Sequence, residues 1–216
     1  MITKAVLWDL DGTLVDSEEF HWQSWQHALG IEGVPVTKVQ FKATFGRRNE
    51  SILSDWLAPD ASPERITRVA DAKEVEYRRL AAEHGLQPLP GAAEWLQRLG
   101  NAGWRQAIAS SAPRLNVDTM LAALHLAHYF DAIVTSEDVT RGKPEPDVFL
   151  AAAARLDAPP SRCIVVEDAA AGIEAAKRAG MRSIGVNLTT RLAADLFVAS
   201  LTELAEDAFD RLLDAR

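Results

Sequence analysis

The chain has 216 residues, of which 48% are hydrophobic and 25% charged, a composition typical of a globular protein with a sizeable core. Its formal net charge of -8 argues against a general binder of nucleic acid or of membrane surfaces. The single cysteine, Cys163, excludes an internal disulfide, and its apolar neighbours predict a buried residue rather than a reactive thiol. No signal-peptide pattern or apolar run of about 20 residues is present, so we expect a cytoplasmic protein.

A short apolar run near the amino terminus, Ala5–Trp8, is followed by two carboxylates, Asp9 and Asp11. If the run is a buried strand of a parallel sheet, both carboxylates emerge at its carboxyl end, where open parallel sheets place their ligand crevices. One carboxylate there can bind a divalent cation and attack phosphorus, while the other handles a proton. The alternative is an ordinary acidic turn, and segments further along the chain bear on this choice.

Strand-like and helix-like segments alternate along most of the chain. Short apolar runs that predict further strands lie at Gln106–Ala109, Ala132–Thr135, Ile164–Glu167 and Ser183–Val186. Helical patterns between them cover Ala92–Leu99, Val148–Leu156 and Gly172–Ala179. This order predicts an α/β fold with a doubly wound parallel sheet, that is, a Rossmann-like core with helices on both faces.

One region interrupts this alternation, because residues 17–85 contain no strand pattern. Helical patterns in this region cover Glu18–Leu29, Glu50–Leu57 and Pro63–His84. Pro63 suits the first turn of its helix, and Gly85 suits the end. We therefore expect an inserted helical cap at residues 17–85 and a Rossmann-like catalytic core formed by residues 1–16 and 86–216. Since the insert begins just after the carboxylates, it is placed to close over them as a lid.

Three later segments supply side chains that fit the same site. Ser110 and Ser111 follow a strand, where hydroxyl and backbone N–H groups can bind phosphate oxygens, although serines there are also common turn residues. Lys143 lies in a proline-containing loop and either contacts that phosphate or is solvated. Glu167 and Asp168 end another apolar run, and a site of oxygen ligands favours Mg²⁺ over zinc.

Taken together, these motifs resemble the haloacid dehalogenase superfamily of phosphohydrolases, within the group similar to beta-phosphoglucomutase and related sugar-phosphate phosphatases. The resemblance extends nearly from end to end. Its motifs occur in the family's order and at suitable separations: Asp9-Leu10-Asp11-Gly12-Thr13, Ser110, Lys143-Pro144, Glu167-Asp168, Ala171-Gly172-Ile173 and Ala175-Ala176. The resemblance implies a doubly wound core with a helical cap inserted after the first strand, in agreement with the pattern above.

The resemblance also implies a role for each motif residue. Asp9 would be the nucleophile that forms an aspartyl-phosphate, and Asp11 would protonate the leaving oxygen and then activate water. Asp9, the backbone carbonyl of Asp11 and Asp168 would hold Mg²⁺, with Glu167 close by. The transferring phosphoryl group would be bound by Ser110, Ser111 and Lys143. Such residues suit the chemistry, because attack on an anionic phosphate needs charge neutralisation and a sugar alkoxide needs an acid to leave.

Several cap residues are assigned to the substrate by the same resemblance. His21 falls where the mutases have a hinge-side histidine, Ser17 matches a hinge hydroxyl, and Lys73 falls where a cap lysine reaches the sugar phosphate. The alternatives are a surface or interface histidine and a solvated lysine. Trp22 and Trp25 are predicted to belong to the cap core rather than to contact substrate.

One cap segment departs from the mutase pattern, which has a lysine before Gly46 and an arginine three residues after it. That arginine holds the second, non-transferring phosphate of the sugar in the mutases. Here the two positions are Phe45 and Asn49. Arg47 and Arg48 either bind an anionic group of the substrate or are surface charges. The departure favours plain phosphatase activity over mutase activity.

The sequence therefore predicts a Mg²⁺-dependent phosphatase that hydrolyses small phosphomonoesters, in particular sugar phosphates, through an aspartyl-phosphate. Two alternatives stay open, a beta-phosphoglucomutase and a non-catalytic sugar-phosphate sensor on the same fold. The expected partner is a small phosphorylated metabolite, not nucleic acid or a membrane. We expect a monomer or a weak dimer.

Overall fold

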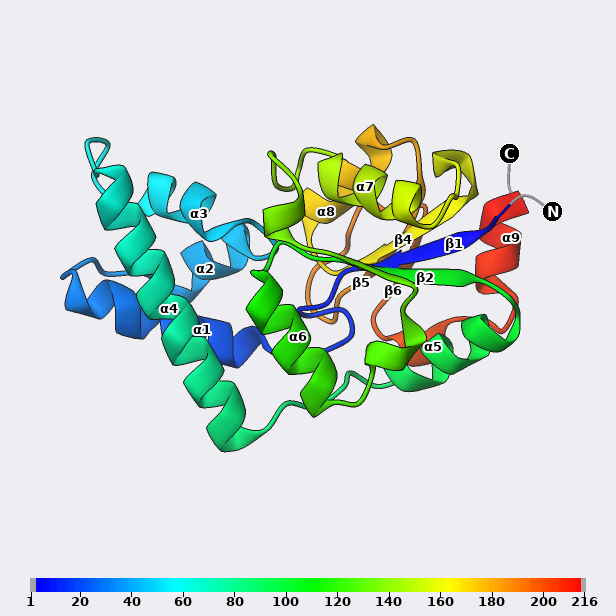
Figure 1. Cartoon of the computed structure of the whole chain (residues 1–216), viewed down its shortest axis with the longest axis horizontal. Helices are drawn as coiled ribbons and strands as arrows, with labels where there is room; N and C mark the ends of the chain where they lie inside the picture. Colours follow the sequence, from blue (N-terminus) through cyan, green and yellow to red (C-terminus); the bar gives the residue numbers. More distant parts are fainter. Residues whose placement is uncertain (1–2, 215–216) are drawn as a thin grey trace.

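The structure, a computed structural model that describes residues 3–214, is built around a parallel sheet with helices on both faces (Figure 1). Its strands are β1 (Ala5–Trp8), β2 (Arg105–Ala109), β3 (Ala132–Val134), β4 (Cys163–Glu167), β5 (Arg182–Val186) and β6 (Leu196–Val198). They lie in the order β3-β2-β1-β4-β5-β6, and every neighbouring pair is parallel. The predicted α/β fold with a doubly wound sheet is therefore confirmed.

The order of the strands explains where a ligand crevice can form. The chain runs outward from β1 to β2 and β3, then crosses to the opposite side of β1 to form β4. In such sheets the crevice lies at the carboxyl ends of the strands, where the direction of winding reverses. Trp8 is paired with Val166 across β1 and β4, so Asp9 and Glu167 follow side by side at this reversal point.

Residues of β1 alternate between the two faces of the sheet, as a strand buried on both sides requires. Val6 and Trp8 pack with helices α5, α6 and α9, whereas Ala5 and Leu7 pack with α7 and α8 on the other face. These helices are α5 (Ala92–Asn101), α6 (Arg114–Ala123), α7 (Asp147–Arg155), α8 (Ala170–Arg178) and α9 (Ala208–Asp214). Short 3₁₀ helices lie at Ala127–Tyr129, Ser136–Asp138, Pro160–Arg162 and Leu201–Glu203.

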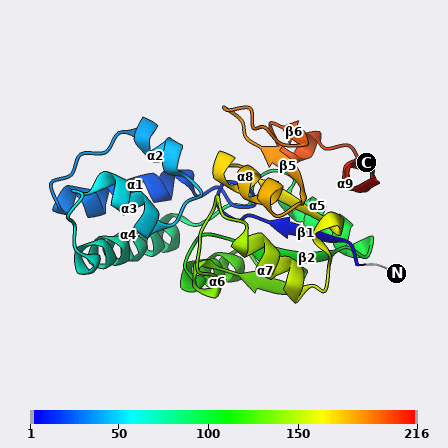
Figure 2. The same cartoon turned by 90° about the horizontal axis from the view of Figure 1, so that it is seen from above.

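Four helices gather beside the sheet as a separate bundle, on the left of Figure 1 and again on the left when seen from above in Figure 2. They are α1 (Glu18–Ile31), α2 (Lys38–Thr44), α3 (Asn49–Trp56) and α4 (Pro63–His84). The bundle has its own apolar cluster, which includes Trp25, Phe41 and Leu53. Trp25 is buried in this cluster and Trp22 packs against it, as the sequence predicts.

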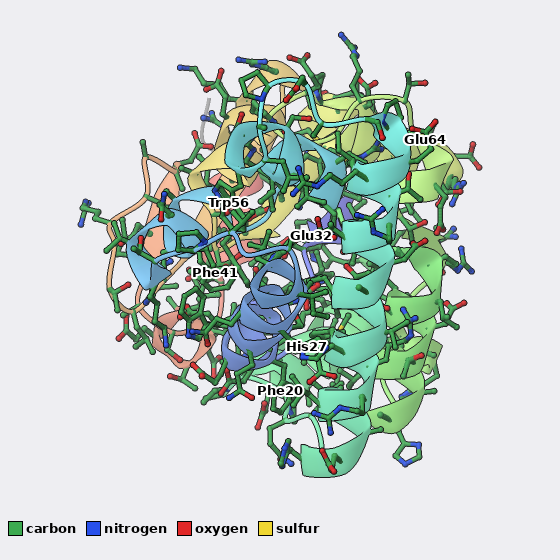
Figure 3. All side chains as sticks on the ribbon, turned by 90° about the vertical axis from the view of Figure 1, so that its left-hand side faces the viewer. Phe20, His27, Glu32, Phe41, Trp56 and Glu64 are labelled. Atoms are coloured by element: carbon green, nitrogen blue, oxygen red, sulfur yellow. The ribbon has the colours of Figure 1, made fainter. Side chains whose placement is uncertain are left out.

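Local sequence signals set the ends of the longest helix, α4. The Ser62 side chain accepts a hydrogen bond from the backbone of the first turn, and Gly85 ends the helix with a φ of +76°. Glu32, just after α1, forms ion pairs with Arg65 and Arg68 of α4 and lies between the two helices (Figure 3). These contacts tie α4 to α1, and the paired helices carry several residues of the site described below.

Cys163 is buried in β4, as predicted. Among the described residues, no helix has both the length and the apolar character that crossing a membrane requires. The cytoplasmic location and the monomeric or weakly dimeric state stay predictions.

Candidate active site

Three carboxylates and one lysine form a buried cluster where β1 and β4 end. The carboxylates of Asp9, Glu167 and Asp168 have oxygens that lie within 4.8 Å of one another. The Lys143 Nζ donates to Asp9 Oδ1 and to Glu167 Oε1, at 2.5 Å in each case. The lysine side chain has no exposed surface. The solvated alternative for Lys143 is therefore wrong, and its ammonium balances part of the buried negative charge.

Two glycines permit this crowding because a side chain at either position would occupy carboxylate space. Gly12 has a φ of +78°, and a Cβ there would lie 2.2 Å from Asp168 Oδ2. A Cβ on Gly172 would lie 1.8 Å from Glu167 Oε1. The same Glu167 side chain accepts a hydrogen bond from the backbone N–H of Ala169, at 2.9 Å. The loops after β1 and β4 are thus shaped around the two acids.

Crowding and burial change the acidity of the cluster. Burial raises the pKa of Asp9 to about 8, with Glu167 adding to the rise and Lys143 opposing it. Burial and the neighbouring carboxylates also raise the pKa of Asp168 well above its ordinary value. For Lys143, burial works to lower the pKa, but Asp9 and Glu167 outweigh it and the net shift is upward. Three acids thus face one ammonium, so bringing a further cation among them is electrostatically favourable.

The donor set also suits a hard divalent cation. Asp9, Glu167 and Asp168 offer oxygen ligands alone, which are the ligands that magnesium and calcium prefer. The cluster is therefore compatible with metal binding. The Asp11 carboxylate is not part of it, because that side chain turns toward the helical bundle.

Asp11 is held by residues at the start of α1. Its Oδ1 accepts from Ser17 Oγ at 2.6 Å and lies 2.9 Å from His21 Nε2. The other ring nitrogen, Nδ1, lies 2.9 Å from Lys73 Nζ. Since an ammonium can only donate, Nδ1 accepts, and Nε2 therefore carries the hydrogen that it donates to Asp11. Burial works to raise the pKa of Asp11, but His21, Ser17 and Lys73 outweigh it and hold that pKa below its ordinary value.

The two predicted phosphate-binding serines lie at the end of β2, beside the carboxylates. Ser110 is buried, and its Oγ accepts from the backbone N–H of Ala112 at 3.0 Å. Ser111 is half-buried. Both serines line the same cavity as Asp9 and Asp11. The structure therefore brings together the side chains that the sequence assigns to a phosphate site.

The helical bundle forms the opposite wall of this cavity. Its lining residues from the bundle are His21, Trp25, Phe41, Thr44, Phe45, Gly46, Arg47, Asn49, Ile52, Lys73 and Glu74. The cavity has a volume of about 50 Å³. That is room for a few water molecules, at roughly 10–15 Å³ for each, and small-molecule sites are commonly about 300–1,000 Å³. A sugar phosphate therefore needs a wider arrangement of the two walls than this one.

His21 and Lys73 are both buried, so the surface alternatives for them are wrong. Lys73 Nζ donates to Glu74 Oε1 at 2.7 Å as well as to His21. Asn49 Nδ2 also donates to Glu74 Oε1, at 2.6 Å. Asn49, which stands where the mutase pattern has an arginine, is thus hydrogen-bonded to the Glu74 carboxylate of the same wall.

The two arginines of this segment have different partners. Arg47 donates to Asp55 Oδ2 at 2.8 Å and to Ser51 Oγ at 2.6 Å. Arg48 instead crosses to the sheet-containing part, where its guanidinium donates to backbone carbonyls. These carbonyls belong to Ser136 (2.7 Å), Val139 (2.7 Å) and Thr140 (3.1 Å). Arg47 lines the cavity but is already paired, and Arg48 joins the bundle to the core.

Sequence reasoning missed Glu74, which is buried beside Lys73. Its Oε2 accepts from Asn116 Nδ2 of α6, a residue that was also missed. A helical signal for Glu74 was present, since it lies four residues after Ala70 and three before Tyr77, both buried. For Asn116 the sequence carries no comparable signal, because its partner comes from a distant helix.

Known proteins resemble this chain over most of its length. The chain matches the haloacid dehalogenase-like hydrolase family over residues 6–186. It is 34% identical to beta-phosphoglucomutase of Bacillus subtilis, covering 93% of this chain and 91% of that protein. It is 31% identical to the fructose-1-phosphate phosphatase YqaB of Escherichia coli, covering 85% and 96%.

A similar solved structure is CbbY from Rhodobacter sphaeroides, a mutant in complex with xylulose-(1,5)bisphosphate. It superposes with a TM-score of 0.83 at 28% identity, covering 94% of this chain and 97% of that chain. The chain belongs to the haloacid dehalogenase-like hydrolase family. The family predicted from the motifs is confirmed, and with it the prediction that the chain is a hydrolase of the phosphoric monoester type.

Proposed function

We propose that this enzyme is a Mg²⁺-dependent phosphatase that hydrolyses small phosphomonoesters, in particular sugar phosphates, through an aspartyl-phosphate on Asp9. The observation that carries the proposal is the pair of differently held aspartates. Asp9 lies among Lys143, Glu167 and Asp168 at the end of β1, whereas Asp11 is bound by Ser17 and His21. Both line one cavity. The pair therefore offers a nucleophile and a separate proton-transfer group.

In the proposed reaction, the Asp9 carboxylate attacks phosphorus and the bond to the leaving oxygen breaks. A cation bound beside Asp9 would favour this ionised form against the burial that raises its pKa. His21, Ser17 and Lys73 hold the pKa of Asp11 below its ordinary value, so Asp11 must take up a proton as substrate binds. It then gives that proton to the leaving oxygen and takes one from the water that hydrolyses the aspartyl-phosphate. Ser110, Ser111 and Lys143 bind the phosphoryl oxygens. The hydrogen bond from His21 fixes the orientation of the Asp11 carboxylate for both steps.

Asp9, the backbone carbonyl of Asp11 and Asp168 are proposed to hold Mg²⁺, with Glu167 close by. When bound, Mg²⁺ would neutralise charge on the phosphoryl oxygens. The fit of the oxygen donors supports this choice of ion, and the buried excess of negative charge supports the need for one.

Residues 17–85 are proposed to act as a cap that opens for substrate and closes for reaction, on a core of residues 1–16 and 86–216. The small volume of the cavity supports such movement, because a substrate cannot enter it as it stands. The contacts from Arg48 to the carbonyls of Ser136, Val139 and Thr140 would have to part on opening.

The central test is Asp9→Asn, assayed with p-nitrophenyl phosphate and Mg²⁺. Turnover should fall by several orders of magnitude, because the nucleophile is lost while the fold is kept. The exposed Asp16, changed to Asn, is a matched control and should keep normal turnover. Chelation of the metal by EDTA should stop hydrolysis. Near-normal turnover of Asp9→Asn or in EDTA would refute the assignment, and an inactive wild-type protein would favour the sensor.

The mutase is the second candidate, favoured by the 34% identity to a beta-phosphoglucomutase. In the mutase pattern an arginine at the position of Asn49 holds the distal phosphate of the sugar. The neutral amide of Asn49 cannot form that charge-assisted contact, which is worth roughly 1.5–3 kcal/mol. The loss would weaken binding of the bisphosphate by about 10- to 150-fold. The test supplies beta-glucose 1-phosphate with catalytic glucose 1,6-bisphosphate and follows both products. We expect mainly inorganic phosphate; efficient formation of glucose 6-phosphate would establish the mutase.

A further inference from the structure

Glu74 is the buried acid of the cap wall, across the cavity from the carboxylates of β1 and β4. Both of its carboxylate oxygens are held: Oε1 by Lys73 and Asn49, at 2.7 and 2.6 Å, and Oε2 by Asn116. Arg78 in turn donates to Asn116 Oδ1 at 2.8 Å, which orients the amide so that its NH₂ group faces Glu74. Helices α3, α4 and α6 therefore fix the position of one carboxylate in a wall that substrate must contact.

The cations of that wall are already matched by carboxylates. Lys73 donates to Glu74, and Arg47 donates to Asp55. A second phosphate would need an unpaired cation in this wall, and the described lining residues offer none. Desolvated like charges repel strongly, so a phosphate near Glu74 would be disfavoured by the carboxylate as well as by the lack of an unpaired cation.

Hydroxyl groups meet a different environment at the same place. Glu74 lines the cavity, and so do the two donors to its Oε1, Asn49 and Lys73, so this wall offers hydrogen-bonding groups to a sugar hydroxyl. Trp25 adds an aromatic surface to the same wall. Acid, amide and aromatic groups together suit the hydroxyl and C–H surfaces of a polyol.

We propose that Glu74 determines substrate specificity: it selects phosphomonoesters whose distal end is an uncharged polyol and rejects those with a second phosphate. This inference rests on the proposed phosphatase function. It adds that the end of the substrate away from the transferred phosphate must be uncharged. It separates this chain from a neighbour crystallised with a bisphosphate, whose fold it shares.

The experiment compares kcat/KM for fructose 1-phosphate with kcat/KM for fructose 1,6-bisphosphate, in wild type and in Glu74→Gln. Gln has the shape of Glu without its charge, so the change frees the Lys73 ammonium to meet an anion. The ratio of bisphosphate to monophosphate kcat/KM should rise about tenfold or more in the variant. Glu76→Gln is the matched control, because Glu76 lies on the same helix but pairs with Arg79 outside the cavity, and its ratio should stay at the wild-type value.

A second measurement needs no variant. In wild type, fructose 1-phosphate should inhibit p-nitrophenyl phosphate hydrolysis at lower concentration than fructose 1,6-bisphosphate does, although the bisphosphate carries more charge. Tighter inhibition by the bisphosphate, or an unchanged ratio in folded Glu74→Gln, would overturn the role of Glu74 and leave the phosphatase proposal intact. Wild-type protein that fails to hydrolyse p-nitrophenyl phosphate would overturn both.

Discussion

Lys143 offers a stringent test of the buried charge cluster, because its removal should destabilise the protein as well as inactivate it. Lys143→Met keeps the approximate size of the side chain but leaves Asp9 and Glu167 buried without their shared ammonium. Removing one partner of a buried ion pair costs about 3–5 kcal/mol. For a chain of this size, about 2–4 °C of unfolding temperature corresponds to each kcal/mol, so the midpoint should fall by roughly 6–20 °C.

The measurement is thermal unfolding in EDTA, so that no metal replaces the missing charge. Lys177→Met is the control, because Lys177 is an exposed lysine on α8, and its midpoint should stay within about 2 °C of wild type. A second change, Glu167→Gln, completes a double-mutant cycle. In wild type it breaks the pair with Lys143, but in Lys143→Met it removes a charge that is already unpaired. Its cost should therefore shrink by about 0.5–3 kcal/mol in the Lys143→Met background. Additive effects, or a Lys143→Met midpoint equal to the control, would refute the ion-pair reasoning.

Two further predictions concern single side chains. His21→Ala should lower kcat/KM for a sugar phosphate by up to the roughly 10²- to 10⁴-fold that a positioned acid contributes, because Asp11 loses its donor. Hydrolysis of p-nitrophenyl phosphate should fall much less, since p-nitrophenolate leaves without a proton, and equal losses on both substrates would contradict the role. Burial raises the pKa of Cys163 to about 12, so its thiol stays protonated far above neutral pH. Iodoacetamide at about pH 8 should then label the unfolded chain but not the native one.

Local sequence patterns were sufficient to predict two elements that carry residues of the candidate site. The run Ala5–Trp8 is both the predicted strand and the observed β1, and α4 spans Pro63–His84 as predicted. Both have strong local signals, a continuous apolar run in one case and defined helix ends in the other. The meeting of Asp9 with Glu167 was expected from the family resemblance and not from local patterns, because β2 and β3 lie between β1 and β4 in the sequence.

Other elements carried weaker or misleading signals. The edge strand β6 has three residues and depends on pairing with β5, so its sequence resembles a loop. Helix α6 was missed although Val117, Met120 and Leu121 have helical spacing and face the core. The serines and proline just before it favour a turn, which obscured the helix that follows.

The polar network of the cap was beyond local reasoning because its partners are far apart in the chain. The resemblance assigned Lys73 to the substrate, with a solvated lysine as the alternative, and Glu74 was missed; both are buried where α4 packs against α1 and α3. Asn116 lies 42 residues from Glu74 and reaches it only in the folded chain. Hydrogen bonds between side chains of different helices depend on packing that no window of sequence contains.

The network joins Glu74, the proposed specificity residue, to Asp11, the proposed proton-transfer group, through a continuous series of contacts. Glu74 holds Lys73, Lys73 donates to His21, and His21 donates to Asp11. Glu74, Lys73 and His21 belong to the helical bundle, whereas Asp11 belongs to the loop after β1. If the bundle moves as the proposed cap, opening separates His21 from Asp11, and the acid loses the donor that orients it. Closure of the cap around the substrate's distal end would then restore the hydrogen bond from His21 to Asp11. A substrate that holds the cap closed would therefore be the one that reacts. Asp9 has no such dependence, since its partners Lys143 and Glu167 both lie in the core. In this proposal the nucleophile, Asp9, is fixed by the core, whereas the proton-transfer group, Asp11, is controlled by the cap.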